Sequence, residues 1–91
     1  MDKSLFASLE DLAVFVAVVQ EGSFSAAALR LGIAGSAISK RMARLETRIG
    51  SQLLLRTTRR LSLTEVGQLA YAKAREADSL LAEALSLAAE R

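Results

Sequence analysis

A stretch of helical periodicity that glycine interrupts and then ends, residues 23–49, constrains the fold of this chain more than any other feature. It reads SFSAAALRLGIAGSAISKRMARLETRI, and Gly50 follows it directly. Because glycine readily adopts the left-handed backbone conformation that ends a helix, Gly32 and Gly50 predict the ends of two helices. Residues 32–35 then form the turn between them. Two short helices joined by so tight a turn predict a helix-turn-helix.

A further helix is predicted before this segment. Ser8 is its expected N-cap and Gly22 its expected end, because apolar residues recur between them at three- and four-residue spacing. Ser25 is expected to cap the second helix, and the third helix is expected over about residues 36–49. The third helix has one apolar face, which predicts its buried residues: Ala37, Ile38, Met42, Leu45 and Ile49.

The pattern changes after Gly50. Residues 53–56 and 61–63 are short, mostly apolar runs around Thr57-Thr58-Arg59-Arg60, which predicts a small β-hairpin with two arginines at its tip. No Asn-Gly or Asp-Gly pair fixes the turn type, so the sequence leaves the strand register open. A hairpin in this position is the wing of a winged helix-turn-helix.

A last helix is predicted from Glu65 to Glu90, with Thr64 as its N-cap and a length of about 39 Å at 1.5 Å per residue. Such a helix extends beyond a core of about sixty residues, so its apolar face needs another partner, most simply the same helix of a second chain. The residues expected at this dimer contact are Val66, Leu69, Ala77, Leu80, Leu81, Ala84 and Leu87.

The predicted fold class is therefore mainly α. Residues 1–63 are expected to form a winged helix-turn-helix domain of three helices and a two-stranded β wing. Residues 64–91 are expected to form a long C-terminal dimerisation helix.

The 91-residue chain has a net charge of only +2, but its charges are unevenly distributed. Residues 30–60 carry eight basic side chains and one acidic side chain, Glu46, which gives this segment a net charge of +7. Residues 1–29 have a net charge of −3 and residues 61–91 a net charge of −2. Since local charge sets the attraction to a polyanion, the middle segment predicts a nucleic-acid partner.

The composition argues against an enzyme. The chain has no cysteine and no histidine, which excludes disulfides, thiolate metal sites and a Ser-His-Asp triad. No metal site and no cofactor are expected. Residues 1–11 lack the pattern of a signal peptide, and the longest apolar run, Leu12 to Val19, is too short to span a bilayer. The sequence therefore predicts a cytoplasmic protein without a membrane partner.

The basic third helix predicts a recognition helix for the major groove of DNA. Glu46 is its only acid, so ion pairs between residues four apart do not account for its charge. Four of its residues are expected to reach base edges: Ser36, Ser39, Lys40 and Arg44. Arg59, in the wing at residues 57–60, is expected to enter the flanking minor groove. Phosphate contacts are expected from six further residues: Ser23, Ser25, Arg41, Arg48, Arg56 and Arg60.

Two other functions are compatible with parts of this pattern. The long amphipathic helix suits a protein-interaction module whose basic face is incidental. Binding to a membrane surface is a weaker alternative, because the basic face lacks the aromatic residues expected at a membrane interface.

Several motifs occur in a characteristic order: Glu-Gly-Ser-Phe at 21–24, Ala-Ala at 26–27, Ser-Ala-Ile-Ser at 36–39, Arg-Leu-Glu at 44–46, Gly50, Leu-Leu-Arg at 54–56 and Leu-Thr-Glu-Val-Gly at 63–67. With this spacing, residues 9–67 resemble the N-terminal winged helix-turn-helix of LysR-type transcriptional regulators. The helix that follows is similar to the linker helix of that family.

The resemblance implies a bacterial regulator that dimerises through the linker helix, often forms tetramers, and binds promoter DNA of dyad symmetry. It also implies an effector-binding domain, before which this chain ends. Either an excised DNA-binding fragment or a naturally shortened protein fits this, and the end within a helical pattern favours truncation. Base contacts carried over from the family fall on Ala34, Gly35, Ser36, Ser39, Lys40 and Arg59. Many members have Gln or Pro where this chain has Gly35, so direct reading of an adenine edge by Gln is not expected here.

Overall fold

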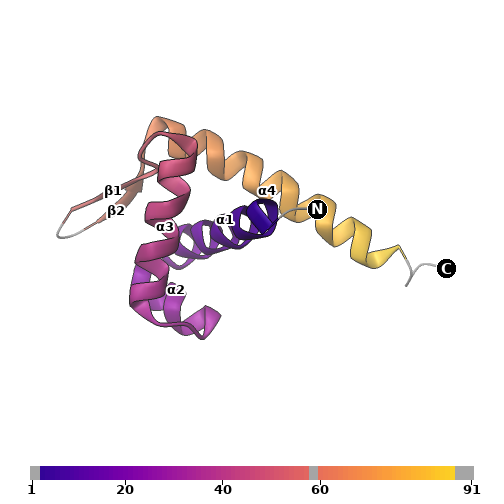
Figure 1. The fold of residues 1–91 in the computed structure, drawn as a ribbon, viewed down its shortest axis with the longest axis horizontal. Helices are drawn as coiled ribbons and strands as arrows, with labels where there is room; N and C mark the ends of the chain where they lie inside the picture. The colour runs from indigo at the N-terminus through magenta and orange to yellow at the C-terminus, as the bar shows by residue number, and fades with distance from the viewer. Residues whose placement is uncertain (1–2, 58–59, 88–91) are drawn as a thin grey trace.

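The computed structural model describes residues 3–57 and 60–87. Its elements follow one another along the chain as α1 (Lys3–Glu21), α2 (Phe24–Leu31), α3 (Gly35–Ile49), β1 (Leu54–Arg56), β2 (Leu61–Leu63) and α4 (Glu65–Ser86). Figure 1 shows α1, α2 and α3 gathered around one another, the β-hairpin projecting to one side, and α4 extending away on the other. The predicted fold class, a winged helix-turn-helix followed by a long helix, is confirmed.

Helix α1 supplies the centre of the core through Val14, Phe15 and Val18, which recur at helical spacing and are buried. The helix begins at Lys3 and not at the predicted N-cap Ser8, because nothing in residues 3–8 is a glycine or proline that would break it. Leu9, at an expected apolar position, is 49% exposed, since it lies toward the helix start and away from this core.

Helix α2 is capped by Ser23 and not by Ser25. The backbone of Ser23 is extended (φ −158°, ψ 157°), so its hydroxyl oxygen accepts a hydrogen bond from the N–H of Ala26 at 3.1 Å. Ser25 already lies inside the helix and is exposed. Gly32 ends the helix in the left-handed conformation, with φ 67°, as the sequence predicted.

Helix α3 begins at Gly35, one residue before the predicted start, and ends at Gly50, which has φ 82°. Its buried residues are Ile38, Met42 and Leu45, three of the five expected. Ala37 is half-buried, and Ile49 is 42% exposed because the last turn extends past the core.

Strands β1 and β2 pair antiparallel, with Leu54 opposite Leu63 and Arg56 opposite Leu61. This register, which the sequence left open, places the turn at residues 57–60. Arg59, the residue predicted to enter a minor groove, lies outside the described residues.

Helix α4 has two apolar faces. One face packs on the core through Gly67, Ala70, Tyr71 and Ala74, and the Tyr71 ring meets Phe15 edge-on with ring centroids 6.1 Å apart. None of these four residues is among those expected at the dimer contact. The helix then continues beyond the core, which gives the molecule its long dimension of 50 Å (Figure 1). Helix α4 ends at Ser86. Its predicted continuation to Glu90 falls mostly on residues 88–91, which lie outside the described residues.

None of the helices in the described residues is both long and apolar enough to cross a membrane. Residues 3–57 and 60–87 also contain no group of three or more acidic, histidine or cysteine side chains suited to a metal ion. The division of the chain into a DNA-binding domain that ends at residue 63 and a dimerisation helix that begins at residue 64 stays a prediction.

Candidate nucleic-acid interface

The N-terminal half of α3 presents small and polar groups to the outside. Gly35, Ser36, Ser39 and Lys40 are exposed, and so is Ala34, the N-cap, whose side chain makes no capping hydrogen bond. Their exposure follows from the packing of Ile38 and of the rest of the buried stripe on α1 and α2. This half of the helix therefore offers the close backbone approach and short donors that reading a DNA groove requires.

The C-terminal half of α3 is tied to α1. Arg44 makes a two-pronged ion pair with Asp11: Nε donates to Oδ2 at 2.9 Å and Nη2 donates to Oδ1 at 2.7 Å. The Asp11 side chain is fully buried, whereas the Arg44 side chain is 47% exposed. Hydrogen bonding to Asp11 raises the pKa of Arg44 above its ordinary value, so the guanidinium stays charged.

A second ion pair joins the same two helices. Arg41 Nη1 donates to Glu10 Oε2 at 2.7 Å, and Glu10 is well exposed. Sequence reasoning missed both acids because it considered only partners on α3 itself, whereas these lie about thirty residues earlier. Nothing in the sequence pairs Glu10 and Asp11 with these arginines. Base reading by Arg44 stays a prediction, and the ion pair gives this residue a competing structural role.

Lys40 differs from these two arginines, since it makes no ion pair with any residue of the described ranges. It is exposed, it follows Ser39, and it lies one turn from Ser36 on the outer face. Its ammonium is therefore available to an external acceptor.

A cleft of about 460 Å³ lies between the start of α2, the exposed side of α3 and the wing. Its lining residues are Gly22, Ser23, Phe24, Ser39, Arg56, Thr57, Arg60 and Leu61. It brings together four predicted DNA-contact residues from three separate parts of the chain: Ser23, Ser39, Arg56 and Arg60.

The cleft fixes the orientation of at least one of its arginines. The guanidinium carbon of Arg56 lies 4.6 Å from the centre of the Phe24 ring, a cation–π contact that ties β1 to the start of α2. On the other side, the oxygen of Ser23 accepts from Ala26, so its own O–H is left to donate outward. Such a set of donors suits a phosphate group.

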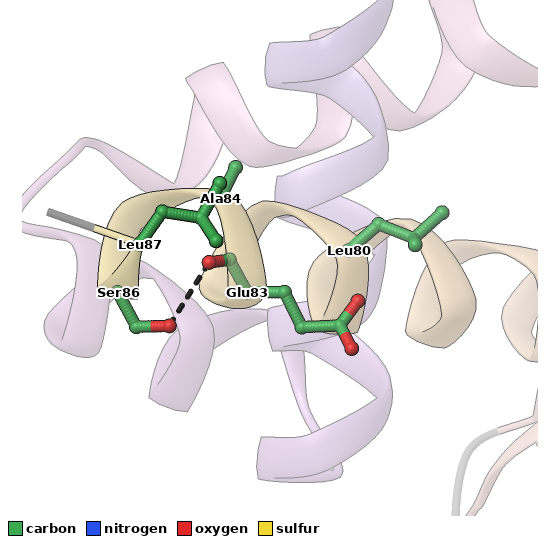
Figure 2. Close-up of a pocket in the computed structure, with 5 residues that line it drawn as sticks. All are labelled: Leu80, Glu83, Ala84, Ser86 and Leu87. Carbon is green, nitrogen blue, oxygen red and sulfur yellow. Dashed lines mark hydrogen bonds between the residues drawn. The ribbon is translucent and has the colours of Figure 1, made fainter. Parts of the chain in front are cut away.

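The predicted dimer contact also lies on the surface. Val66, Leu69, Leu80, Leu81 and Leu87 are exposed, and all four leucines are more than half exposed. Figure 2 shows the side chains of Leu80, Ala84 and Leu87 on one side of the last turns, with the Glu83 carboxylate and the Ser86 hydroxyl on the other. Ala77 and Ala84 are exposed too. Leu85, 73% exposed, was not among the expected residues because it lies at the edge of the expected stripe.

A family model described as "Bacterial regulatory helix-turn-helix protein, lysR family" matches residues 9–68. Among curated proteins, the HTH-type transcriptional regulator PtxR of Pseudomonas aeruginosa is 42% identical over 87 residues, which cover 91% of this chain and 28% of PtxR. The HTH-type transcriptional regulator CrgA of Neisseria meningitidis is 59% identical over 58 residues, which cover 64% of this chain and 19% of CrgA. The chain thus spans less than a third of these relatives, which are named as regulators and not as enzymes.

Solved structures give the same result. The BenM DNA-binding domain in complex with catB site 1 DNA is 36% identical, with a TM-score of 0.84, and covers 90% of this chain and 92% of that chain. The full-length regulator LysG of Corynebacterium glutamicum is 34% identical, with a TM-score of 0.83, and covers 91% of this chain and 29% of that chain.

Proposed function

Because this chain belongs to the lysR family of bacterial regulatory helix-turn-helix proteins, we propose that it binds duplex operator DNA as a homodimer and regulates transcription. The observation that carries the proposal is the position of Ser39. It belongs both to the exposed half of α3 and to the arginine-lined cleft. A single duplex can therefore meet the helix and the wing at the same time. The DNA-bound BenM domain, which has the same fold, supports this arrangement.

In the proposed complex, α3 lies in the major groove with its N-terminal half against the bases. Ser36, Ser39 and Lys40 reach base edges, while Ala34 and Gly35 allow close backbone approach. Lys40 suits a guanine, whose O6 and N7 accept hydrogen bonds. Arg44 joins this set only by leaving Asp11, so we assign it first to holding α3 in place.

The phosphates flanking this groove are held by the cleft. Arg56, Arg60 and the Ser23 hydroxyl donate to one strand, with Ser25 at the exposed start of α2. Arg48 lies farther along α3 and approaches the DNA backbone beyond the base contacts, and Arg41 contacts a phosphate only by leaving Glu10. For Arg59 we propose the minor groove, where narrow A·T-rich segments attract arginine.

The exposed apolar face of α4 supports the homodimer. Leucines more than half exposed along one helix face are costly in water, and burying each contributes about 1.5–3 kcal/mol. Pairing α4 with its copy relates two α3 helices by a dyad, so the half-sites are spaced by about 34–36 Å or a multiple of that distance. We also propose further assembly of two dimers to a tetramer. The proposed location of the protein is the bacterial cytoplasm, where promoter DNA lies.

The test of DNA binding is selection of bound duplexes from a random pool, followed by titration at about 50 mM and 200 mM salt. We expect a dyad-symmetric sequence, and an affinity that falls by about 10³–10⁵-fold between the two salt concentrations if six to ten phosphates are contacted. Binding that is absent or insensitive to salt would contradict the proposal and favour a protein-interaction module.

The dimer is tested separately with the double variant Leu80→Ala, Leu81→Ala. Sedimentation equilibrium should show a shift to monomer, and operator binding should weaken. Leu29→Ala is the control, because Leu29 is even more exposed than Leu80 and Leu81 but lies on α2. If the double variant stays dimeric, the α4 contact is wrong.

A further inference from the structure

The strongest observation outside the DNA-binding surface is the way α3 and α4 are joined through the backbone of residues 52–53. Glu46 is the only acid in residues 30–60, and its carboxylate binds the backbone of the segment that follows α3. Its Oε2 accepts the N–H of Leu53 at 2.7 Å and the N–H of Leu54 at 3.2 Å. Its backbone carbonyl accepts the N–H groups of Gly50 and Ser51. One residue of α3 therefore binds four amides of the chain that leaves the helix.

The same short segment also binds the start of α4. The carbonyl of Leu53 accepts the N–H of Thr64 at 3.0 Å, and the carbonyl of Gln52 accepts the Thr64 hydroxyl at 2.7 Å. The Thr64 hydroxyl oxygen in turn accepts the N–H of Gly67 at 2.9 Å, which caps α4. Leu53 is thus bonded to α3 through its N–H and to the residue capping α4 through its carbonyl.

Gly67 lets the first turn of α4 pack closely against the backbone of Leu53. A Cβ atom added at this position would clash with the carbonyl oxygen of Leu53 and lie 2.9 Å from its carbonyl carbon. The first turn of α4 therefore rests directly on the Leu53 backbone. Among the five glycines it is the only one whose added Cβ meets another atom within 4 Å.

We propose that Glu46, Leu53, Thr64 and Gly67 form a rigid joint that sets the angle between α3 and α4, and thereby the operator half-site spacing that the dimer accepts. This inference rests on the proposed function. At 1.5 Å per residue the 22 residues of α4 span about 33 Å, so a rotation of about 10° at the joint displaces the far end by roughly 6 Å. That exceeds the 3.4 Å rise of one base pair.

The test measures spacing preference. Single variants Gly67→Ala, Glu46→Gln and Thr64→Val are compared with the unaltered chain on duplexes whose two half-sites are moved apart or together by one or two base pairs. Gln68→Ala, next to Gly67 and exposed, is the control for a change in α4, and Thr64→Ser keeps the hydroxyl. Affinity for a single half-site is measured in parallel.

The unaltered chain, Gln68→Ala and Thr64→Ser should discriminate between the best spacing and a one-base-pair change on the order of tenfold, the scale of one misplaced base contact. The other variants should lose most of this discrimination or shift its optimum, with single half-site affinity within about twofold. If they keep the original optimum and discrimination while overall affinity falls, the joint is merely structural and the proposal is overturned. If the unaltered chain binds no duplex, the proposed function fails instead.

A second measurement needs no DNA. The chain lacks cysteine, so Ala43→Cys on α3 and Ala82→Cys on α4, both exposed, take spin labels at these two positions only. Labelled chains diluted with unlabelled chains report the distance within one protomer by pulsed electron paramagnetic resonance. Glu46→Gln and Thr64→Val should broaden or shift the distribution by several ångströms. Distance distributions identical to that of the parent chain would overturn the proposed joint. This measurement decides the matter even if Gly67→Ala does not fold.

Discussion

The two halves of α3 have the same basic character in the sequence but different surroundings in the structure. The first half exposes Ser36, Ser39 and Lys40, and Lys40 makes no ion pair within the described ranges. Arg41, in the middle of the helix, and Arg44, in its second half, are held by α1. A count of cations on a helix therefore overstates how many of them are available to DNA. Part of the charge positions the helix, and the rest is left for recognition.

The largest effect is expected from Arg44→Ala, which leaves the buried Asp11 carboxylate without its partner. Removing one member of a fully buried pair costs about 3–5 kcal/mol, and a smaller loss is expected here because Arg44 is half exposed and water can reach the vacated space. Urea denaturation measures this loss.

The same variant also tests the comparison itself. When bound sequences are selected below its unfolding transition, Arg44→Ala should retain the base preference of the parent chain. Loss of preference at one base position would show that Arg44 reads DNA, and the division of α3 into two halves would fail.

Lys40→Ala tests the other half. It should leave the free energy of unfolding within about 0.5 kcal/mol, because the side chain is exposed and makes no ion pair in the described ranges. Operator binding should weaken by about 1–3 kcal/mol, with relaxed preference at one base position. Equal weakening on all duplexes, seen by fluorescence anisotropy, would make Lys40 a phosphate contact only.

Ser23, the N-cap of α2, allows a test of how much capping contributes to stability. Ser23→Ala should lower the free energy of unfolding by about 1 kcal/mol through loss of the cap on α2. Ser25→Ala is the matched control and should change stability little, because Ser25 is exposed inside the helix. Thermal unfolding followed by circular dichroism compares them, and equal losses would contradict the assignment of Ser23 as the cap.

The smallest effect is expected from Glu10→Gln. The Arg41 pair lies at the surface, where such pairs contribute about 0.2–1 kcal/mol. If Glu10→Gln lowers the free energy of unfolding as much as Arg44→Ala does, exposure does not explain the difference expected between the two ion pairs. The double variant with Arg41→Gln, measured by urea denaturation, isolates the pair energy.

Much of the fold followed from local signals. Gly32 and Gly50 end their helices because the left-handed conformation at a helix end strongly favours glycine, and Thr64 caps α4 as its position predicted. The helix start at Lys3 did not follow, because a cap residue such as Ser8 can equally occupy a helix interior. The choice between Ser23 and Ser25 depended on the backbone angle that follows the end of α1.

The site residues stay predictions, and their grouping could not be read from the sequence. The sequence named Ser23, Ser39, Arg56 and Arg60 as DNA contacts, but only the fold brings them to one cleft. It made no prediction for Tyr71 and Ala74, which face the core on another side of α4 than the expected dimer residues.

By itself, the sequence determined the element order, the basic segment and the family, since helical period, glycine ends and motif spacing are properties of neighbouring residues. Only the tertiary structure decided which charges remain for DNA. Asp11 and Arg44 are 33 residues apart, and they meet because α1 crosses α3. The sequence also did not show why Glu46 and Gly67 occupy their positions. Both act on the backbone of Leu53, and contacts to a backbone leave no pattern in the side chains that a sequence displays.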